Sequence, residues 1–224
     1  MRYLGVVKKV SLVSAGNIVN AGFGLVFLTA CARVLIPADF GKYALLTTLL
    51  VFMSKVVDFG SNSVFVAESL RTQDRDLLIK RFYFLKTALF AVAVLLSIIV
   101  LYFLDLISLP IMGIFILGLI FYSVNVTLFA IYQASEMFTH AVLLNTVPAM
   151  AKAFLGVLIL LHLLTPSVLG VYGIFALSMG LCIVLYFYIP REFKVTSWIN
   201  KSPRGFLAIL NTSFPAGTSQ LISQ

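Results

Sequence analysis

Charged residues are what this sequence has least of. Only 11% of its 224 residues are Asp, Glu, Lys or Arg, while 61% are hydrophobic. An average soluble domain is about 25% charged, so a soluble fold of this size could not cover its surface with so few charges. In hydrocarbon, by contrast, helices that are apolar on most faces are stable. The composition therefore excludes an ordinary soluble domain and indicates an integral membrane protein.

Cysteine and histidine are also scarce. Cys31 and Cys182 lie in apolar segments without metal-ligand spacing, which excludes a disulfide framework and a cysteine metal site. His140 and His162 are isolated. The sequence also lacks a phosphate-binding glycine loop and a nucleophile elbow. We therefore expect no catalytic residue, no metal site and no cofactor, and an enzyme is the weaker class of function.

Long uncharged runs define the expected fold, because a helix needs about 20 apolar residues to cross about 30 Å of hydrocarbon. The turn signal Thr165-Pro166-Ser167 divides one run that is too long for a single span. We expect an all-α integral membrane fold, with a six-helix transmembrane bundle followed by the start of a seventh helix. The bundle is assigned to residues 1–200, and residues 201–224 to the end of a linker and the incomplete first helix of a second lobe. The predicted spans are residues 10–32, 43–67, 85–104, 109–132, 141–164 and 168–189.

The lysines and arginines are distributed unevenly between the two sides of this bundle. If the N-terminus is cytoplasmic, most of the 16 fall on the inner side, Lys86 among them, and the outer loops hold only Arg33 and Lys42. This positive-inside bias predicts a cytoplasmic N-terminus. The net charge of +8 follows from that topology, so we do not expect nucleic acid as a partner.

Charged residues inside predicted spans mark candidate sites, because each costs about 2.5–3.5 kcal/mol on insertion scales. Lys55 and Asp58 lie three residues apart in the second span and can pair on one helix face. Lys152 lies near the centre of the fifth span. Two lysines against one aspartate leave a net positive charge, which suits an anionic substrate. We favour a functional role for both lysines, because one carboxylate cannot neutralise both.

Asparagines accompany these charges on polar stripes of the predicted helices. We favour helix packing for them, because amide side chains commonly form hydrogen bonds between membrane helices. They remain substrate-binding candidates in a polar cavity. The full candidate set is Lys55, Asp58, Asn62, Lys152, Asn145, Asn17, Asn20, Asn125 and Arg33.

Two motifs carry a resemblance to a known family. The stretch ARVLIPADFGKY at residues 32–43 joins the first two spans, and DFG follows at residues 58–60. This pattern resembles bacterial polysaccharide flippases of the multidrug/oligosaccharidyl-lipid/polysaccharide exporter superfamily, which carry a similar A-R-x-L-x-P-x-D/E-F-G-x-Y stretch. Within it, we expect Pro37 and Gly41 to shape a tight turn. The rest of the chain resembles the family by topology alone.

The resemblance implies two six-helix lobes around a cavity that opens alternately to the two sides of the bacterial inner (plasma) membrane. The cargo would be an oligosaccharide linked to undecaprenyl diphosphate, such as an O-antigen, capsule or exopolysaccharide repeat unit. Membrane lipids and other polysaccharide assembly proteins would be partners. The chain is shorter than the family pattern, so we expect it to be a truncated N-terminal lobe.

Two alternatives stay open. A drug/cation antiporter of the same superfamily would be expected to have a net acidic cavity. A membrane-embedded glycan polymerase or ligase would need a large outer loop.

Overall fold

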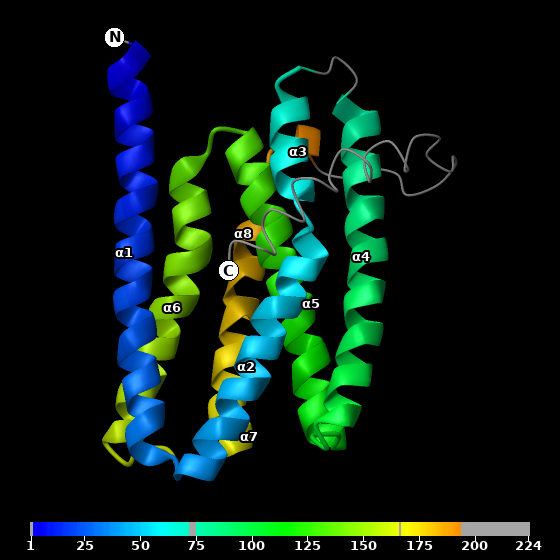
Figure 1. The fold of residues 1–224 in the computed structure, drawn as a ribbon. Helices are drawn as coiled ribbons and strands as arrows, with labels where there is room; N and C mark the ends of the chain where they lie inside the picture. Colours follow the sequence, from blue (N-terminus) through cyan, green and yellow to red (C-terminus); the bar gives the residue numbers. More distant parts are fainter. Residues whose placement is uncertain (1, 72–74, 166, 194–224) are drawn as a thin grey trace.

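The computed structural model describes residues 2–71, 75–165 and 167–193, and within these ranges it contains helices and no strand (Figure 1). Six segments are long and apolar enough to cross a membrane. The protein is therefore a multi-pass, all-α membrane bundle, as the sequence predicts. The expected seventh helix lies outside the described residues. The elements are α1 (Arg2–Val34), α2 (Pro37–Asp58), α3 (Ser61–Ser69), α4 (Arg75–Phe103), α5 (Leu109–Ala134), α6 (Phe138–Leu160), α7 (Val168–Ser178), a 3-10 turn η1 (Met179–Cys182), α8 (Ile183–Tyr186) and a 3-10 turn η2 (Arg191–Phe193).

Helix starts at one end of the bundle follow ordinary capping chemistry. Pro37 occupies the first turn of α2, where a missing N–H costs little. The Ser108 and Ser167 side chains cap α5 and α7 by accepting hydrogen bonds from the N–H groups of Ile111 and Gly170. The connections at this end are short, so α1 turns directly into α2 and α4 directly into α5 (Figure 1). We call the opposite end, which carries the N-terminus and α3, the basic end.

The second span is not one continuous helix. Phe59 and Gly60 both adopt left-handed backbone conformations, with φ values of 38° and 72°, and they separate α2 from α3. Glycine adopts this conformation readily, whereas a residue with a Cβ pays about 1–2 kcal/mol. The single helix predicted for residues 43–67 is therefore broken, although α2 and α3 together still form one membrane span over Pro37–Ser69.

The expected turn at Gly41 is wrong. Gly41 lies inside α2, and the turn between the first two spans is confined to the residues just before Pro37. Proline at the first helical position already fixes the backbone for helix entry. The motif therefore starts a helix and does not prolong a loop.

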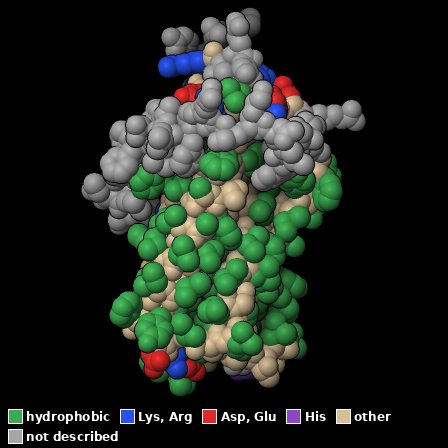
Figure 2. Space-filling view, turned by 90° about the vertical axis from the view of Figure 1, so that its right-hand side faces the viewer, with side chains coloured by type: hydrophobic (Ala, Val, Ile, Leu, Met, Phe, Trp, Pro, Cys, Tyr) green, Lys and Arg blue, Asp and Glu red, His purple; other side chains and the backbone are tan. Residues whose placement is uncertain are grey.

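Packing between helices departs from their order in the chain. α1 packs along α6 and makes few contacts with its neighbour α2. Small residues allow this approach: a Cβ added to Gly16 would lie 2.6 Å from Val142, and one added to Gly156 would lie 2.9 Å from Phe27. Apolar side chains cover the middle of the face in Figure 2, and charged side chains gather at its two ends. This is the surface expected of a protein surrounded by lipid.

Candidate functional site

A buried ion pair holds the break between α2 and α3 to α4. The Lys86 Nζ atom lies 3.3 Å from Oδ1 of Asp58, and the side chains are only 6% and 12% exposed. Lys86 also donates a hydrogen bond of 3.4 Å to the Val57 carbonyl and lies 5.3 Å from the centre of the Phe82 ring. The same Asp58 oxygen accepts a hydrogen bond of 3.3 Å from the backbone N–H of Asn62 in the first turn of α3. Asp58 thus ends one helix, caps the next and neutralises a cation.

The expected pairing of Asp58 with Lys55 is therefore replaced by a pairing with Lys86. Asp58 faces the bundle interior at the end of α2, whereas Lys55 lies on a half-buried side of that helix. The assignment of Lys86 to the basic side loops also needs correction, because it is a buried residue of α4. Its position beside a long uncharged run made it look like a loop cation.

Two of the candidate asparagines form hydrogen bonds between helices. The Asn62 side chain donates to the Val126 carbonyl at 3.1 Å and joins α3 to α5. The Asn125 side chain donates to the Leu144 carbonyl at 2.9 Å and joins α5 to α6. These contacts correspond to the packing role that we favoured for the asparagines.

The remaining polar candidates do not converge on one point. Asn17 and Arg33 are exposed on α1, and Asn145 is half-buried on α6. The Asn20 oxygen is buried and has no hydrogen-bond partner among the described residues. None of these four lines the pocket described below.

Lys55 and Lys152 occupy different surroundings. Lys55 is half-buried, on the side of α2 that also carries exposed Thr48 and Phe52. Lys152 is 9% exposed, and its Nζ atom lies 4.7 Å from the centre of the Phe175 ring on α7. Within the described ranges, neither ammonium group lies within ion-pair distance of a carboxylate.

The aromatic surroundings of Lys152 extend across three helices. The Phe175 ring stacks on Tyr122 of α5 and meets Tyr43 of α2 edge-on. A cation over a ring is stabilised by about 2 kcal/mol or more when desolvated. This attraction replaces only part of the hydration that Lys152 loses, and the part of the chain that the structure describes places no carboxylate at ion-pair distance from it.

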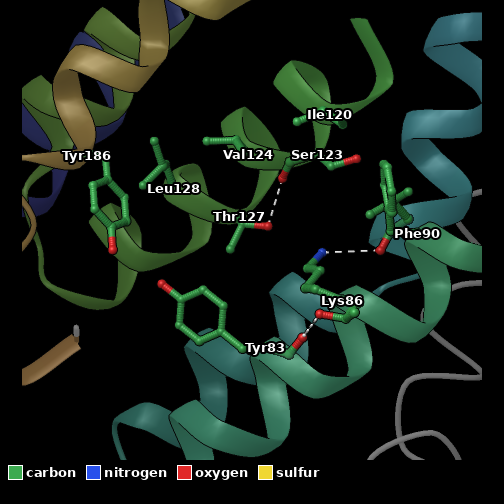
Figure 3. A pocket seen from close by; sticks show the side chains of 11 residues that line it. Tyr83, Lys86, Phe90, Ile120, Ser123, Val124, Thr127, Leu128 and Tyr186 are labelled. Atoms are coloured by element: carbon green, nitrogen blue, oxygen red, sulfur yellow. Dashed lines mark hydrogen bonds between the residues drawn. The ribbon is translucent and has the colours of Figure 1, made fainter. Parts of the chain in front are cut away.

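A pocket of about 270 Å³ lies where α4 and α5 diverge toward the basic end (Figure 3). Lys86 forms part of its wall, and hydroxyl-bearing and apolar side chains form the remainder. Sequence reasoning missed this pocket, because its walls come from four separate helices. The lining residues are Val57 of α2, Tyr83, Lys86, Thr87 and Phe90 of α4, Ile120, Ser123, Val124, Thr127 and Leu128 of α5, and Tyr186 of α8.

Comparison with known proteins identifies the family. A family model described as polysaccharide biosynthesis protein matches residues 6–224. The chain belongs to this family. The family gives it a role in polysaccharide biosynthesis, and the six membrane-crossing helices place that role in a membrane. No curated protein and no solved structure matches the chain. The match to the polysaccharide biosynthesis family thus supports the resemblance seen in the loop motif. In the described part of the chain, no group of three His, Cys, Asp or Glu side chains could hold a metal ion.

Proposed function

We propose that this protein is a flippase, not an enzyme, and that it moves oligosaccharide linked to undecaprenyl diphosphate across the bacterial inner membrane. The observation that carries the proposal is that Lys55 and Lys152 lie within membrane spans with no carboxylate of the described residues at ion-pair distance. Because Asp58 pairs with Lys86, its negative charge does not offset Lys55 or Lys152. The net positive charge that these two lysines bring to the membrane spans is therefore larger than the sequence alone suggested. A diphosphate is a complementary cargo, since charge-assisted hydrogen bonds to phosphate are strong where water is excluded.

The two lysines differ in how they would meet such a cargo. Lys55 lies on a side of α2 that is partly open, near exposed Thr48. Lys152 is covered by Phe175 in this conformation. Transport by alternating access requires a second conformation, and the proposal expects α7 to move away from Lys152 in it. The expected orientation places the N-terminus in the cytoplasm, with the cargo loaded from that side.

The alternatives fit the charges and loops less well. A cation antiporter would be expected to leave uncompensated acidic groups in its cavity. Here Asp58 is paired with Lys86, and the described residues place no carboxylate at ion-pair distance from Lys55 or Lys152. A glycan polymerase or ligase would need a large loop at the end opposite the basic end. The described connections at that end are short, for example between Phe103 and Leu109.

Complementation with the full-length protein tests this proposal. The double variant Lys55→Gln, Lys152→Gln should abolish surface glycan, and Lys→Arg at either position should retain part of it because charge is preserved. Membrane abundance is measured alongside, since the reasoning requires loss of export without loss of protein. Lys42→Gln, at an exposed position in the second turn of α2, is the matched control. Full export by the double variant would overturn the cationic-cavity argument.

A further inference from the structure

We propose that the pocket between α4, α5 and α8 binds an anionic phospholipid from the leaflet at the basic end of the bundle. One acyl chain would lie in the pocket, and the phosphate would lie at its mouth beside Tyr83 and Tyr186. This lipid is separate from any transported cargo, so the inference does not depend on the proposed flippase activity.

The dimensions of the pocket suit one chain. Its lining on α5 runs from Leu128 to Ile120, which at 1.5 Å per residue is about 12 Å of axial depth. Its lining on α4 runs from Tyr83 to Phe90, or about 10 Å. One leaflet contributes about half of a 30 Å hydrocarbon core, so the pocket spans most of one leaflet.

The walls of the pocket have few free hydrogen-bonding groups for a water molecule. The hydroxyl groups of Thr87, Ser123 and Thr127 donate their hydrogens to carbonyls of their own helices, at 2.9, 2.6 and 2.7 Å. Between these groups the lining consists of Val, Leu, Ile and Phe side chains. An ordered water needs two to four polar partners, so a hydrocarbon chain is the better occupant.

At the mouth of the pocket, unlike along its walls, two tyrosine hydroxyls are available to a ligand. The hydroxyls of Tyr83 and Tyr186 face one another across it (Figure 3), and tyrosine is the residue that membranes place at the interface with water. Both hydroxyls can donate hydrogen bonds to a phosphate oxygen. Lys86 lies in the wall but is already neutralised by Asp58, so it does not recruit the anion by itself.

The surroundings of the mouth indicate where the occupant comes from. The flanking helices carry large exposed apolar residues, including Phe84 at 48% and the residue after α8, Phe187, at 74% exposure. These side chains contact lipid in a membrane. Arg81 lies half-buried on α4, two residues before Tyr83, and basic pockets between membrane helices bind anionic head groups. Lys80 lies beside it but is paired with Asp76 at 2.6 Å. Charge complementarity therefore selects an anionic phospholipid over a zwitterionic one.

Photolabelling of the full-length protein in nanodiscs tests the position of the chain. The probe is phosphatidylglycerol with a diazirine in the middle of one acyl chain, and the labelled peptides are mapped by mass spectrometry. Labelling should concentrate on the α4 and α5 segments that line the pocket. Ile120→Trp fills the floor and should lower that labelling about fivefold, which corresponds to about 1 kcal/mol. Leu117→Trp, similarly exposed on α5 but outside the pocket, should leave it unchanged.

A competition experiment tests the head group. Unlabelled phosphatidylglycerol should displace the probe better than phosphatidylcholine does, and Tyr83→Phe with Tyr186→Phe should remove this preference. Tyr102→Phe, at the far end of α4 and 70% exposed, is the control. Equal displacement by both lipids from the native protein would overturn the anionic assignment. Labelling that Ile120→Trp leaves intact would overturn the pocket itself, and stronger displacement by a polyprenyl phosphate would assign the pocket to the carrier lipid instead.

Discussion

Removing one partner of the Asp58–Lys86 pair should destabilise the protein strongly. Asp58→Asn leaves the Lys86 ammonium buried without a counter-charge, and Lys86→Met leaves a buried carboxylate. Breaking a buried ion pair from one side costs about 3–5 kcal/mol, whereas removing both charges is often close to neutral. The double variant Asp58→Asn, Lys86→Met should therefore recover most of the loss, which a double-mutant cycle measures directly.

The two cysteines provide the assay. Cys31 and Cys182 are free and buried, so a thiol-reactive fluorophore labels them only when the bundle opens. For a chain of this size, 1 kcal/mol shifts the melting temperature by about 2–4 °C. We therefore expect each single variant to melt about 6–20 °C lower than the native protein in the same detergent.

A matched control separates burial from charge. The Lys80–Asp76 pair is also on α4, but its side chains are 40% and 66% exposed. Exposed pairs contribute about 0–1 kcal/mol, so Asp76→Asn should leave the melting temperature nearly unchanged. The reasoning is refuted if Asp58→Asn melts like the native protein, or if the double variant is as unstable as both singles combined.

Three further predictions follow from the helix contacts and the charge distribution. Gly156→Leu should push α1 away from α6 and destabilise the bundle by about 1–3 kcal/mol. Gly22→Leu is the control, because a Cβ added to Gly22 meets nothing within 4 Å, and the same thiol-labelling assay compares the two variants. Gly41→Ala should be tolerated or stabilise α2 by up to about 1 kcal/mol, and a fall in folded yield would show that the residue is needed in a turn after all. Reporter fusions at Gln73 and Asp39 should give cytoplasmic and periplasmic signals respectively, and the reverse pattern would invert the proposed orientation.

The six-span fold could be predicted because hydrophobic length is a local property of the sequence. A run of about 20 apolar residues implies a span whatever it packs against. The effect of Pro37 on the turn before α2 was also predictable, because it depends only on the backbone of neighbouring residues. The break at Phe59 and Gly60 was not predicted, because a continuous helix and a helix interrupted by two left-handed residues have nearly the same hydropathy.

The charge pairing could not be predicted because it depends on which helices face one another. Spacing along α2 suggested Lys55 as the partner of Asp58, since residues three apart share a helix face. The actual partner comes from α4. A charge beside an apolar run looks like the end of a span, yet α4 continues well beyond Lys86 to Arg75. No feature of the sequence distinguishes a lysine that ends a span from one that turns inward to a carboxylate.

The pairing of α1 with α6 has a consequence for how the protein is made. During synthesis, Phe27 enters the membrane long before its packing partner Gly156 exists. At about 5–20 residues per second, the ribosome needs about 6–25 s to produce the intervening chain. For that time the small and polar side chains of α1 lie in lipid, or against whatever guides insertion, without the surface that later covers them. A nascent chain arrested before α6 would therefore expose a helix face adapted to a partner that it does not yet have.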